Sequence, residues 1–544
     1  MAGKLTMFNS GRAMRVIRKP LFLIIAFLFV SSGTAFGADA VIATGDVSAV
    51  NIQTCAEARS DGESCIIEDG SYDDLGIITI DDNMTAATYI KAETPGGVTF
   101  TGTTRFLVTG DYWVIQDFVF SGFNGPSPNP AYRAAIQLGG DNTRVTNNEF
   151  KNSTWATMSS GFLQFIRICS TGVSLCSNTA DDAEVDHNYF HDNNSMQGII
   201  AYSDATYFAS APQIHHNYFK DWTNTYDANN FAIALTDNEP GSDQDMRAVV
   251  EWNVIDNWSG DDECLMVKNS SNTIRYNIFK DLGDSVVPNY VQAISLRLGE
   301  DNVVFNNWLF STETTERMRG ILVRDKGHKI VNNYFQGDFY AYSIYLGPYD
   351  GGDSQKAENV LVDFNTFVLT NSYPAMLFGT DTAPSINNTI SNNLFIGAAD
   401  IGKDDTSGNC TATFTDNISY VSDGDYFDGT GCNSGWPGDS SNIDQLTEAQ
   451  YNALFTTRVT DYATISILDG DNEAIGNSTR NASYTNDFDG QARSDPADTG
   501  ADEYSAGALA IEPISTSCVG PTWAVGYVDC DAAPSQSIQG VSIQ

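Results

Sequence analysis

A short pattern of apolar and polar positions recurs along the middle of the chain. It runs apolar-x-x-Asn-x-apolar, in the segments "VTNNEF", "VDHNYF", "IHHNYF", "VEWNVI", "IRYNIF", "VFNNWLF", "IVNNYF", "VDFNTF" and "ISNNLF". The asparagines that carry the pattern are Asn148, Asn188, Asn217, Asn253, Asn277, Asn307, Asn333, Asn365 and Asn393, with spacings of 24 to 40 residues. Such spacing is typical of a solenoid, in which each repeat forms one coil.

Within each repeat, apolar and polar residues alternate, and Val, Ile, Phe and Tyr dominate. This period of two indicates strands and excludes amphipathic helices. We therefore predict an all-β fold, a right-handed parallel β-helix, whose repeated asparagines form a ladder of side-chain amides at one turn. The repeated Asn and Phe are accordingly assigned to structure and not to chemistry.

The segments that flank the repeats predict the ends of the solenoid. The stretch "VSAVNIQTCAEARSDGESCIIEDGSY" predicts a short amphipathic helix and a strand, which cap the first coil. After about Asn417 the repeat gives way to a polar sequence rich in Gly, Asp and Ser. We expect a β-helix catalytic domain at 38–440 and an irregular C-terminal capping region at 441–544.

The first 37 residues have the pattern of a secretory signal peptide. Five basic residues precede and flank the apolar run "PLFLIIAFLFV", and small residues follow it. The run is far shorter than the roughly 20 residues of a membrane-spanning helix. The sequence therefore predicts a secreted or periplasmic protein without a membrane span.

The charge of the chain limits its possible partners. Without the leader, 23 basic residues face 69 acidic ones, so nucleic acid is an improbable partner and a polyanion needs a local cationic patch or a bound cation.

Eight of the nine cysteines form neighbouring pairs that predict disulfides in an exported chain: Cys55 with Cys65, Cys169 with Cys176, Cys410 with Cys432, and Cys518 with Cys530. Cys264 is left over, and we interpret it as a buried core thiol.

The repeat also serves as a ruler for polar residues. Lys268 lies 9 residues before its repeat asparagine, Arg297 lies 10 before and Arg324 lies 9 before. Three cations on successive coils therefore share nearly one angular position, about 5 Å apart per coil. In so acidic a chain, this row is not expected from composition.

Acidic residues lie beside the row by the same ruler. Glu263 and Asp261 precede Asn277 by 14 and 16 residues, and on the previous coil Asn238 and Asp237 precede Asn253 by 15 and 16. Oxygen ligands without Cys or His favour Ca²⁺. The alternative is a chance cluster, because about one residue in eight is acidic.

These motifs resemble polysaccharide lyase family 6, the group of alginate lyases and chondroitinase B. The resemblance is carried by "DDECLMVKNSS", "ISLRLGEDNVVFNNWLF" and "RGILVRDKGHKIVNNYFQG", in order and one coil apart, and it extends to "EDGSYDD" and "AETPGGVTFTG" near the start. The lysine and arginine motifs together are fairly specific, whereas either alone is not.

The resemblance implies β-elimination of a uronate-containing polysaccharide. Lys268 matches the base that removes the C5 proton, and Arg297 matches the residue that assists the leaving group. Asp261 and Glu263 match the calcium ligands, with Asn238 or Asp237 as a third. This agrees with the chemistry, because a bound Ca²⁺ neutralises the substrate carboxylate and, with Arg297, lowers the pKa of a nearby lysine.

One departure from the family pattern is Leu298, which stands where the family has a histidine after the arginine. Arg324, Arg319 and His328, one coil further on, are candidates for binding substrate carboxylates, although His328 is equally compatible with a structural turn residue. Tyr342 and Tyr345 are candidates for a sugar-stacking platform, and ordinary strand tyrosines are the alternative.

The sequence thus predicts a calcium-dependent lyase that acts on an anionic polysaccharide, alginate. Three alternatives stay open: a lyase of dermatan or chondroitin sulfate, a non-catalytic polysaccharide-binding β-helix, and an epimerase or glycoside hydrolase. A hydrolase needs closely placed paired carboxylates on neighbouring coils, and an epimerase needs a different constellation, such as a Tyr/His pair.

Overall fold

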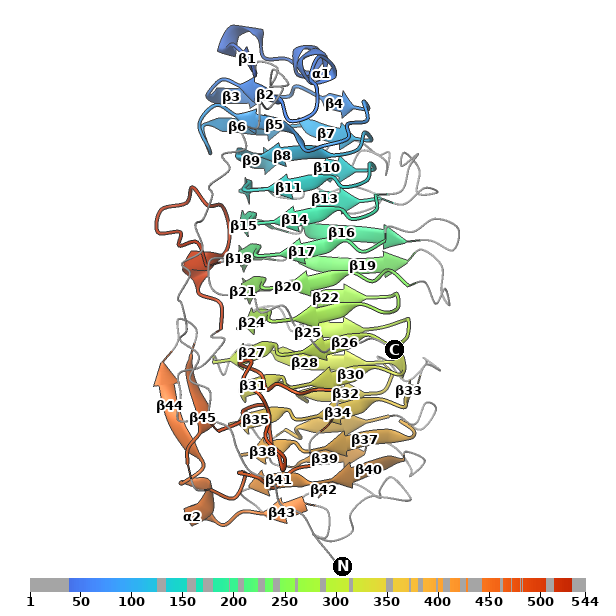
Figure 1. Cartoon of the computed structure of the whole chain (residues 1–544), viewed down its shortest axis with the longest axis vertical. Coiled ribbons are helices and arrows are strands. Elements are labelled where there is room, and N and C mark those ends of the chain that lie inside the picture. The colour runs from blue at the N-terminus through green and yellow to red at the C-terminus, as the bar shows by residue number, and fades with distance from the viewer. Residues whose placement is uncertain are drawn as a thin grey trace, which may run out of the picture. The chain divides into compact units, whose positions relative to one another are not determined.

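Three long parallel β-sheets, formed by successive coils, dominate the structure (Figure 1). The computed structural model describes residues 39–124, 134–153, 163–169, 180–194, 196–203, 210–223, 230–237, 245–259, 263–283, 290–312, 317–348, 356–370, 373–379, 385–397, 400–404, 411–420, 427–428, 443–459, 463–470, 472–479, 481, 483–504 and 513–530. Each coil visits sheet 1, then sheet 3, then sheet 2, and each strand pairs in parallel with its counterpart on the next coil. The predicted parallel β-helix is confirmed.

From β2 (Ser64–Ile67) to β42 (Phe427–Asp428), the strands of the three sheets follow one another in the order sheet 1, sheet 3, sheet 2. Sheet 1 contains β1 (Ala40–Ile42), β2 (Ser64–Ile67), β5 (Thr88–Ala92), β8 (Trp113–Gln116), β11 (Arg144–Thr146), β14 (Glu184–Asp186), β17 (Gln213–His215), β20 (Val249–Glu251), β23 (Thr273–Arg275), β26 (Val303–Phe305), β30 (Lys329–Val331), β34 (Leu361–Asp363), β37 (Asn388–Ser391) and β40 (Ala412–Thr415). Sheet 2 contains β4 (Ile77–Ile80), β7 (Arg105–Val108), β10 (Ala134–Leu138), β13 (Gln164–Ile168), β16 (Gln197–Ser203), β19 (Ile233–Asp237), β22 (Glu263–Val267), β25 (Val291–Leu296), β28 (Met318–Val323), β32 (Ile344–Leu346), β36 (Met376–Phe378), β39 (Gly402–Asp404) and β42 (Phe427–Asp428). Sheet 3 contains β3 (Gly70–Asp73), β6 (Val98–Gly102), β9 (Phe118–Phe123), β12 (Glu149–Lys151), β15 (Tyr189–His191), β18 (Tyr218–Trp222), β21 (Val254–Trp258), β24 (Ile278–Lys280), β27 (Trp308–Ser311), β31 (Tyr334–Gly337), β35 (Thr366–Leu369), β38 (Leu394–Ile396), β41 (Asn417–Tyr420) and β43 (Ile443–Gln445).

A few described elements lie outside the three sheets. They are α1 (Ala49–Glu57), α2 (Glu448–Tyr451), the 3-10 turns η1 (Thr44–Asp46) and η3 (Thr516–Cys518), the parallel pair β29 (Asp325–Lys326) and β33 (Ala357–Glu358), and the antiparallel pair β44 (Phe455–Val459) and β45 (Thr464–Leu468). None of the described helices is long and apolar enough to cross a membrane.

The repeat asparagines form the predicted ladder at the turn from sheet 1 to sheet 3. Each side-chain Nδ2 donates to the Oδ1 of the asparagine on the next coil at 3.0 to 3.1 Å. The ladder begins at Asn148 and extends one coil beyond the repeats found in the sequence, to Asn417. Because all ten side chains have at most 1% exposure, these bonds form away from water and fix the register of successive coils.

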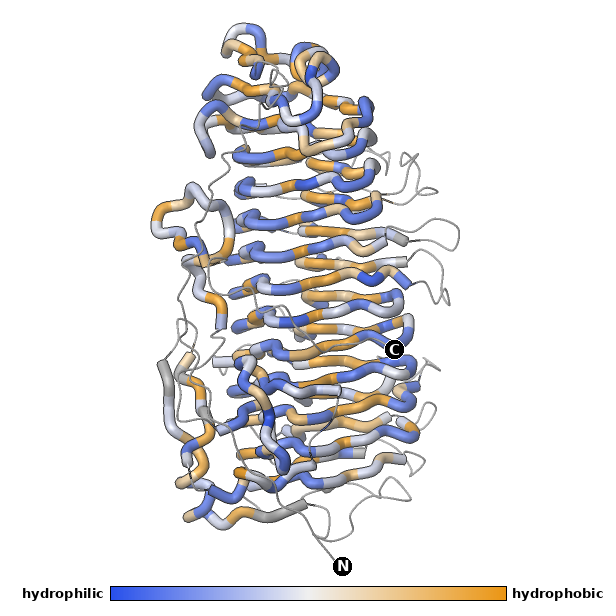
Figure 2. Tube along the Cα trace, viewed as in Figure 1, coloured by the Kyte–Doolittle hydropathy of each residue, from blue (hydrophilic) through white to orange (hydrophobic). Residues whose placement is uncertain are grey.

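The inner face of the coils forms one continuous apolar core. Figure 2 shows hydrophobic and hydrophilic positions alternating along the coils, as expected where one face of each strand is buried. Phenylalanines stack from coil to coil within this core, as in Phe120 on Phe150 at 4.9 Å and Phe150 on Phe190 at 4.8 Å. Cys264 belongs to the same core with no exposed surface, and burial raises the pKa of its thiol, which confirms its interpretation as a structural residue.

The N-terminal cap consists of the predicted helix, α1, and strand, β2. Ser48 caps α1 by accepting a hydrogen bond from the Asn51 amide, and Ile52 and Ala56 are the buried residues of the helix. The Cys55–Cys65 disulfide joins α1 to β2. The Cys518–Cys530 disulfide is also present, and Cys169 is disulfide-bonded, whereas Cys176, Cys410 and Cys432 lie outside the described residues.

The residue before each ladder asparagine adopts a left-handed backbone conformation. We call these the corner residues: Asn147, His187, His216, Trp252, Tyr276, Asn306, Asn332, Phe364, Asn392 and Asp416, with φ between 52° and 57°. A turn of only two residues between the sheets requires this conformation, which Asn, Asp and His adopt more readily than most side chains.

The C-terminal segment runs back along the corner residues. Asn392 donates to Thr479 O, Asn332 to Asn486 O and Asn306 to Asp487 O, at 3.5, 2.8 and 3.3 Å. Further on, the Gly520 amide donates to His216 O at 2.9 Å, and the Trp523 indole donates to Asn147 O at 2.9 Å. The segment therefore contacts coils from near the C-terminal end of the solenoid to the fourth coil.

The expected capping region, 441–544, stays a prediction. Its first described strand, β43, is the last strand of sheet 3. Within the described residues, the part around α2, β44 and β45 packs at the last coils, through Leu446, Leu454 and Leu468 against Leu394 and Ile418. Thr479, Asn486, Asp487, Gly520 and Trp523 lie along the side of the solenoid, where side-chain amides and backbone carbonyls of corner residues bond them.

Candidate functional site

The three predicted cations lie in one row on sheet 2. Lys268, Arg297 and Arg324 each follow directly on the last residue of β22, β25 and β28. The Arg297 amide donates to Val267 O at 2.8 Å and the Arg324 amide to Leu296 O at 2.9 Å, so the three residues occupy the same position on successive coils. Lys268 and Arg297 are half-buried, and Arg324 is 3% exposed. The predicted row is therefore present, with neighbouring backbones about 4.8 Å apart.

A buried carboxylate lies beside the row. Glu263, the first residue of β22, is 1% exposed and its Oε1 lies 3.1 Å from Arg297 Nη1. Ser295 Oγ donates to the same oxygen at 3.1 Å. This pair holds the Arg297 guanidinium in place and compensates part of the repulsion among three cations on adjacent coils.

Gln292 lies beside Glu263 on the next coil, and the sequence analysis did not single it out. It is the register partner of Glu263 on the next coil, has no exposed surface, and neither its Oε1 nor its Nε2 has a hydrogen-bond partner. Leaving a buried amide without partners costs about 1–3 kcal/mol for each group. The same ruler that located Glu263 also locates Gln292, which precedes Asn307 by 15 residues.

Glu263 is the predicted calcium ligand whose side chain lies in the described part of the chain. Asp261 and Asn238 lie outside the described residues, and Asp237 is described only by its backbone, at the end of β19 in register with Ser203. Within the described ranges, two other groups of side chains are close enough to hold a metal ion: Asp186, His187 and His215, and Asp487, Asp489 and Asp502. Neither group lies on sheet 2.

Aromatic side chains surround Arg319 at the opposite end of the same strands. The Arg319 guanidinium lies 3.2 Å from the Tyr290 ring centre and 5.2 Å from that of Tyr342. Tyr342 and Tyr345 pack against each other at 5.2 Å and are 3% and 6% exposed, so they present little surface.

Two tyrosines near Arg319 are more accessible than the predicted pair. Tyr290 and Tyr340 are half-buried and stack at 6.0 Å, and Tyr373 packs edge-on against Tyr340. Sequence reasoning missed them, because they precede their strands and fall outside the repeat pattern.

His328 has a structural position. Its Nδ1 accepts a hydrogen bond from the Asn302 amide at 3.2 Å, and its Nε2 donates to Arg324 O at 2.7 Å. The ring has no exposed surface, and burial lowers its pKa to about 4. Among the two alternatives raised by the sequence, this placement favours the turn residue, and His328 supports Arg324 through the backbone.

Comparison with known proteins gives the chain a family. The family model described as chondroitinase B matches residues 47–438, well over half of the chain. No curated protein matches.

Solved structures with the same fold include three lyases. An alginate lyase of polysaccharide lyase family 6 has 18% identity and a TM-score of 0.60, over 79% of this chain and 55% of that one. A mannuronic acid-specific family 6 lyase from human gut microbiota has 19% identity and a TM-score of 0.56, over 71% and 87%. A family 6 polysaccharide lyase from Pseudopedobacter saltans has 15% identity and a TM-score of 0.58, over 89% and 99%. The chain thus spans about half of the first structure, and at these identities the likeness is one of fold.

Proposed function

Because this chain belongs to the chondroitinase B family of polysaccharide lyases, we propose that it is an exported lyase that cleaves alginate by calcium-assisted β-elimination. The observation that carries the proposal is the row of Lys268, Arg297 and Arg324 beside buried Glu263 on sheet 2. In a chain with a formal charge of -41, this row supplies the local positive field that a polyanionic substrate needs. The leader sequence and the disulfides support export.

The proposed reaction breaks two bonds of a uronate residue. The Lys268 amine takes the C5 proton, the C5–H electrons form a C4=C5 double bond, and the C4–O4 bond breaks. Arg297, held by Glu263 at 3.1 Å, stabilises the charge that develops on O4, and a solvent water molecule then gives O4 its proton. Arg324, the next cation of the row, is buried and adds to the positive field that attracts the sugar carboxylates.

The donor set around Glu263 fits calcium. Glu263 and the unpartnered Oε1 of Gln292 are buried oxygen donors on adjacent coils, and hard oxygen ligands suit Ca²⁺. Calcium bound here supplies charge neutralisation for the substrate carboxylate. The residues proposed to hold it are Asp261, Glu263, Gln292, and Asn238 or Asp237.

Two observations bear on the substrate. The similar structures include an alginate lyase and a mannuronic acid-specific lyase, which favours alginate. The family description, chondroitinase B, supports dermatan or chondroitin sulfate as a second candidate. Arg319 with Tyr290 and Tyr340 offers a further contact surface for a sugar carboxylate and ring, on the same face of the coils as the row.

The test is a lyase assay on the chain from residue 38. Elimination creates an unsaturated uronate, so ultraviolet absorbance is followed with alginate and with dermatan sulfate, in calcium and in EDTA. We expect a rise on alginate that EDTA suppresses. No rise on either polysaccharide would refute the lyase, and a rise on dermatan sulfate alone would select the second candidate.

The base is tested by substitution. Lys268→Ala should abolish the rise in absorbance while leaving the circular dichroism and melting temperature unchanged. Lys329→Ala is the matched control, since Lys329 is a half-buried strand lysine on sheet 1. Retained activity in Lys268→Ala would assign the base to another residue.

A further inference from the structure

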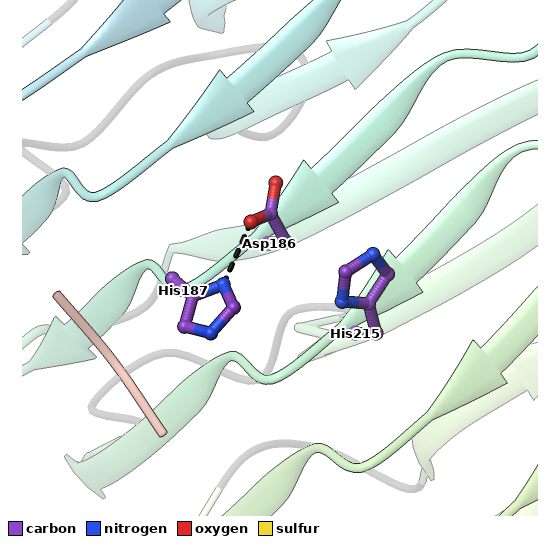
Figure 3. A group of neighbouring side chains, drawn as sticks. All are labelled: Asp186, His187 and His215. Atoms are coloured by element: carbon purple, nitrogen blue, oxygen red, sulfur yellow. Dashed lines mark hydrogen bonds and ion pairs between the residues drawn. The ribbon is translucent and has the colours of Figure 1, made fainter. Parts of the chain in front are cut away.

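Three histidines and an aspartate meet at the turn from sheet 1 to sheet 3. Asp186 ends β14, and its register partner His215 ends β17 on the next coil. The corner residues His187 and His216 follow them directly, with φ of 52° and 54°. The four side chains therefore form a two-by-two arrangement, Asp-His above His-His, which we call the histidine corner. Figure 3 shows Asp186 and His187 directed toward each other, with His215 on the neighbouring strand.

The nitrogen atoms of the histidine corner converge. His187 Nδ1 lies 2.7 Å from Asp186 Oδ2, and His215 Nδ1 lies 3.0 Å from His216 Nδ1. The His187 and His216 rings stack at 4.9 Å with an interplanar angle of 5°. One ligand atom from each of Asp186, His187 and His215 lies within 4.8 Å of the others. Two Nδ1 atoms at hydrogen-bond distance have only one proton to share, which leaves at least one lone pair directed into the group.

Outer carboxylates and arginines orient these ligands. His215 Nε2 lies 3.0 Å from Glu184 Oε1, so a proton on Nε2 leaves the Nδ1 lone pair facing the group. A ligating histidine usually holds its second nitrogen on a carboxylate in this way. Arg144 donates to both oxygens of Asp186, at 2.7 and 2.6 Å, and Thr146 Oγ1 donates to Oδ2 at 2.9 Å, which fixes the carboxylate.

We propose that the histidine corner binds a transition-metal ion, with zinc as the preferred biological ion, through His187, His215, His216 and Asp186. Imidazole nitrogens select Zn²⁺, Cu²⁺ or Ni²⁺ over Ca²⁺, and three histidines with one carboxylate satisfy a four-coordinate zinc ion. The local charge also favours a cation: Glu184, Asp186 and Glu251 outnumber Arg144 and Arg275, which pair with them.

The bound ion fastens the C-terminal segment. The Gly520 amide donates to His216 O at 2.9 Å, and the Tyr527 ring lies 6.0 Å from the His187 ring. Both residues belong to the part of the segment that the Cys518–Cys530 disulfide closes. A metal that fixes His187 and His216 therefore also fixes the surface on which this part rests. The site is independent of the lyase chemistry on sheet 2.

The experiment is a cobalt titration of the chain from residue 38, treated with EDTA and returned to a calcium buffer. Co²⁺ reports tetrahedral coordination by its visible absorption, and Zn²⁺ displaces it. We expect one equivalent of Co²⁺ to bind and Zn²⁺ to remove the band. His215→Gln and His216→Asn should abolish the band, and Glu184→Gln should weaken binding about 10- to 100-fold. Asn is chosen at 216 because it tolerates the left-handed conformation.

His191→Ala is the matched control. His191 lies on β15 of the same coil as His187 but pairs with Glu149 and Asp192. It should bind Co²⁺ as the wild type does. Absence of a stoichiometric tetrahedral band in the wild type, or equal binding by His215→Gln, would overturn the proposal. If a histidine variant fails to fold, the wild-type titration and Glu184→Gln still decide the question.

Discussion

Asn277→Ala tests whether the asparagine ladder sets the register on which the sheet 2 site depends. The Asn277 Nδ2 donates to Val250 O, Arg275 O and Asn307 Oδ1 at 2.9 to 3.0 Å, and its Oδ1 accepts from the Asn253 amide and side chain at 3.1 and 3.0 Å. Alanine removes all five bonds and leaves the Asn253 amide without its acceptor in a fully buried position.

The cost follows from these contacts. A buried amide without an acceptor costs about 1–3 kcal/mol, and each remaining hydrogen bond contributes about 0.5–1.5 kcal/mol. Because the bonds share partners and do not add fully, we expect a loss of about 4 kcal/mol in the free energy of unfolding. Asn452→Ala is the control: this asparagine is exposed, has a right-handed backbone at the end of α2, and should change stability by less than about 0.5 kcal/mol.

The assay combines urea unfolding with hydrogen exchange and lyase activity. Asn277 lies between Lys268 and Arg297 in the sequence, at the turn from β23 to β24, and its ladder partner Asn307 lies at the turn from β26 to β27 that follows Arg297. Since a solenoid couples mainly neighbouring coils, exchange should rise in 245–312 and not in 88–116, and kcat should fall. A loss in Asn277→Ala no larger than in Asn452→Ala, or uniform exchange along the chain, would refute this account of the ladder.

Three further predictions concern single residues. Iodoacetamide should not label Cys264 in the folded protein, because burial raises the pKa of its thiol, and mass spectrometry should find labelling only after denaturation. Asp502→Asn should flatten the pH dependence of stability measured in EDTA. Burial raises the native pKa of Asp502 from 3.8 to about 7, so the wild type loses stability as the pH rises from about 4 through 7. A variant whose stability falls with the same slope would contradict this. Leu298→His, which restores the family residue beside Arg297, should raise kcat/KM on the preferred polysaccharide, and unchanged kinetics would show that another group performs that role.

The sequence by itself determined the solenoid and the row of cations. Both depend on a repeat that is visible in the sequence as one asparagine per coil. These asparagines set the register, and the register places Lys268, Arg297 and Arg324 above one another. The same local rule explains why the Cys55–Cys65 disulfide was predicted, since its partners are ten residues apart in sequence. Parallel strands that pair only with adjacent coils make such local information sufficient.

Only the tertiary structure decided what non-repeating residues touch. The path of the C-terminal segment depends on groups up to 376 residues away, as in Trp523 with Asn147, and no period in the sequence encodes that pairing. The sequence also does not encode the surroundings of two single residues. His328 is hydrogen-bonded to the Asn302 amide and to Arg324 O, and the Gln292 amide is recognisable as unpartnered only once its surroundings are known.

The histidine corner depends both on the sequence repeat and on the tertiary structure. The sequence contains "VDHNYF" and "IHHNYF" one coil apart, and register alone places their first polar residues side by side. The left-handed conformation of His187 and His216 then turns two imidazoles toward that pair, and backbone conformation at a turn is a property of the folded chain. The repeat fixes which residues are neighbours, and the packing at each turn fixes which atoms face one another.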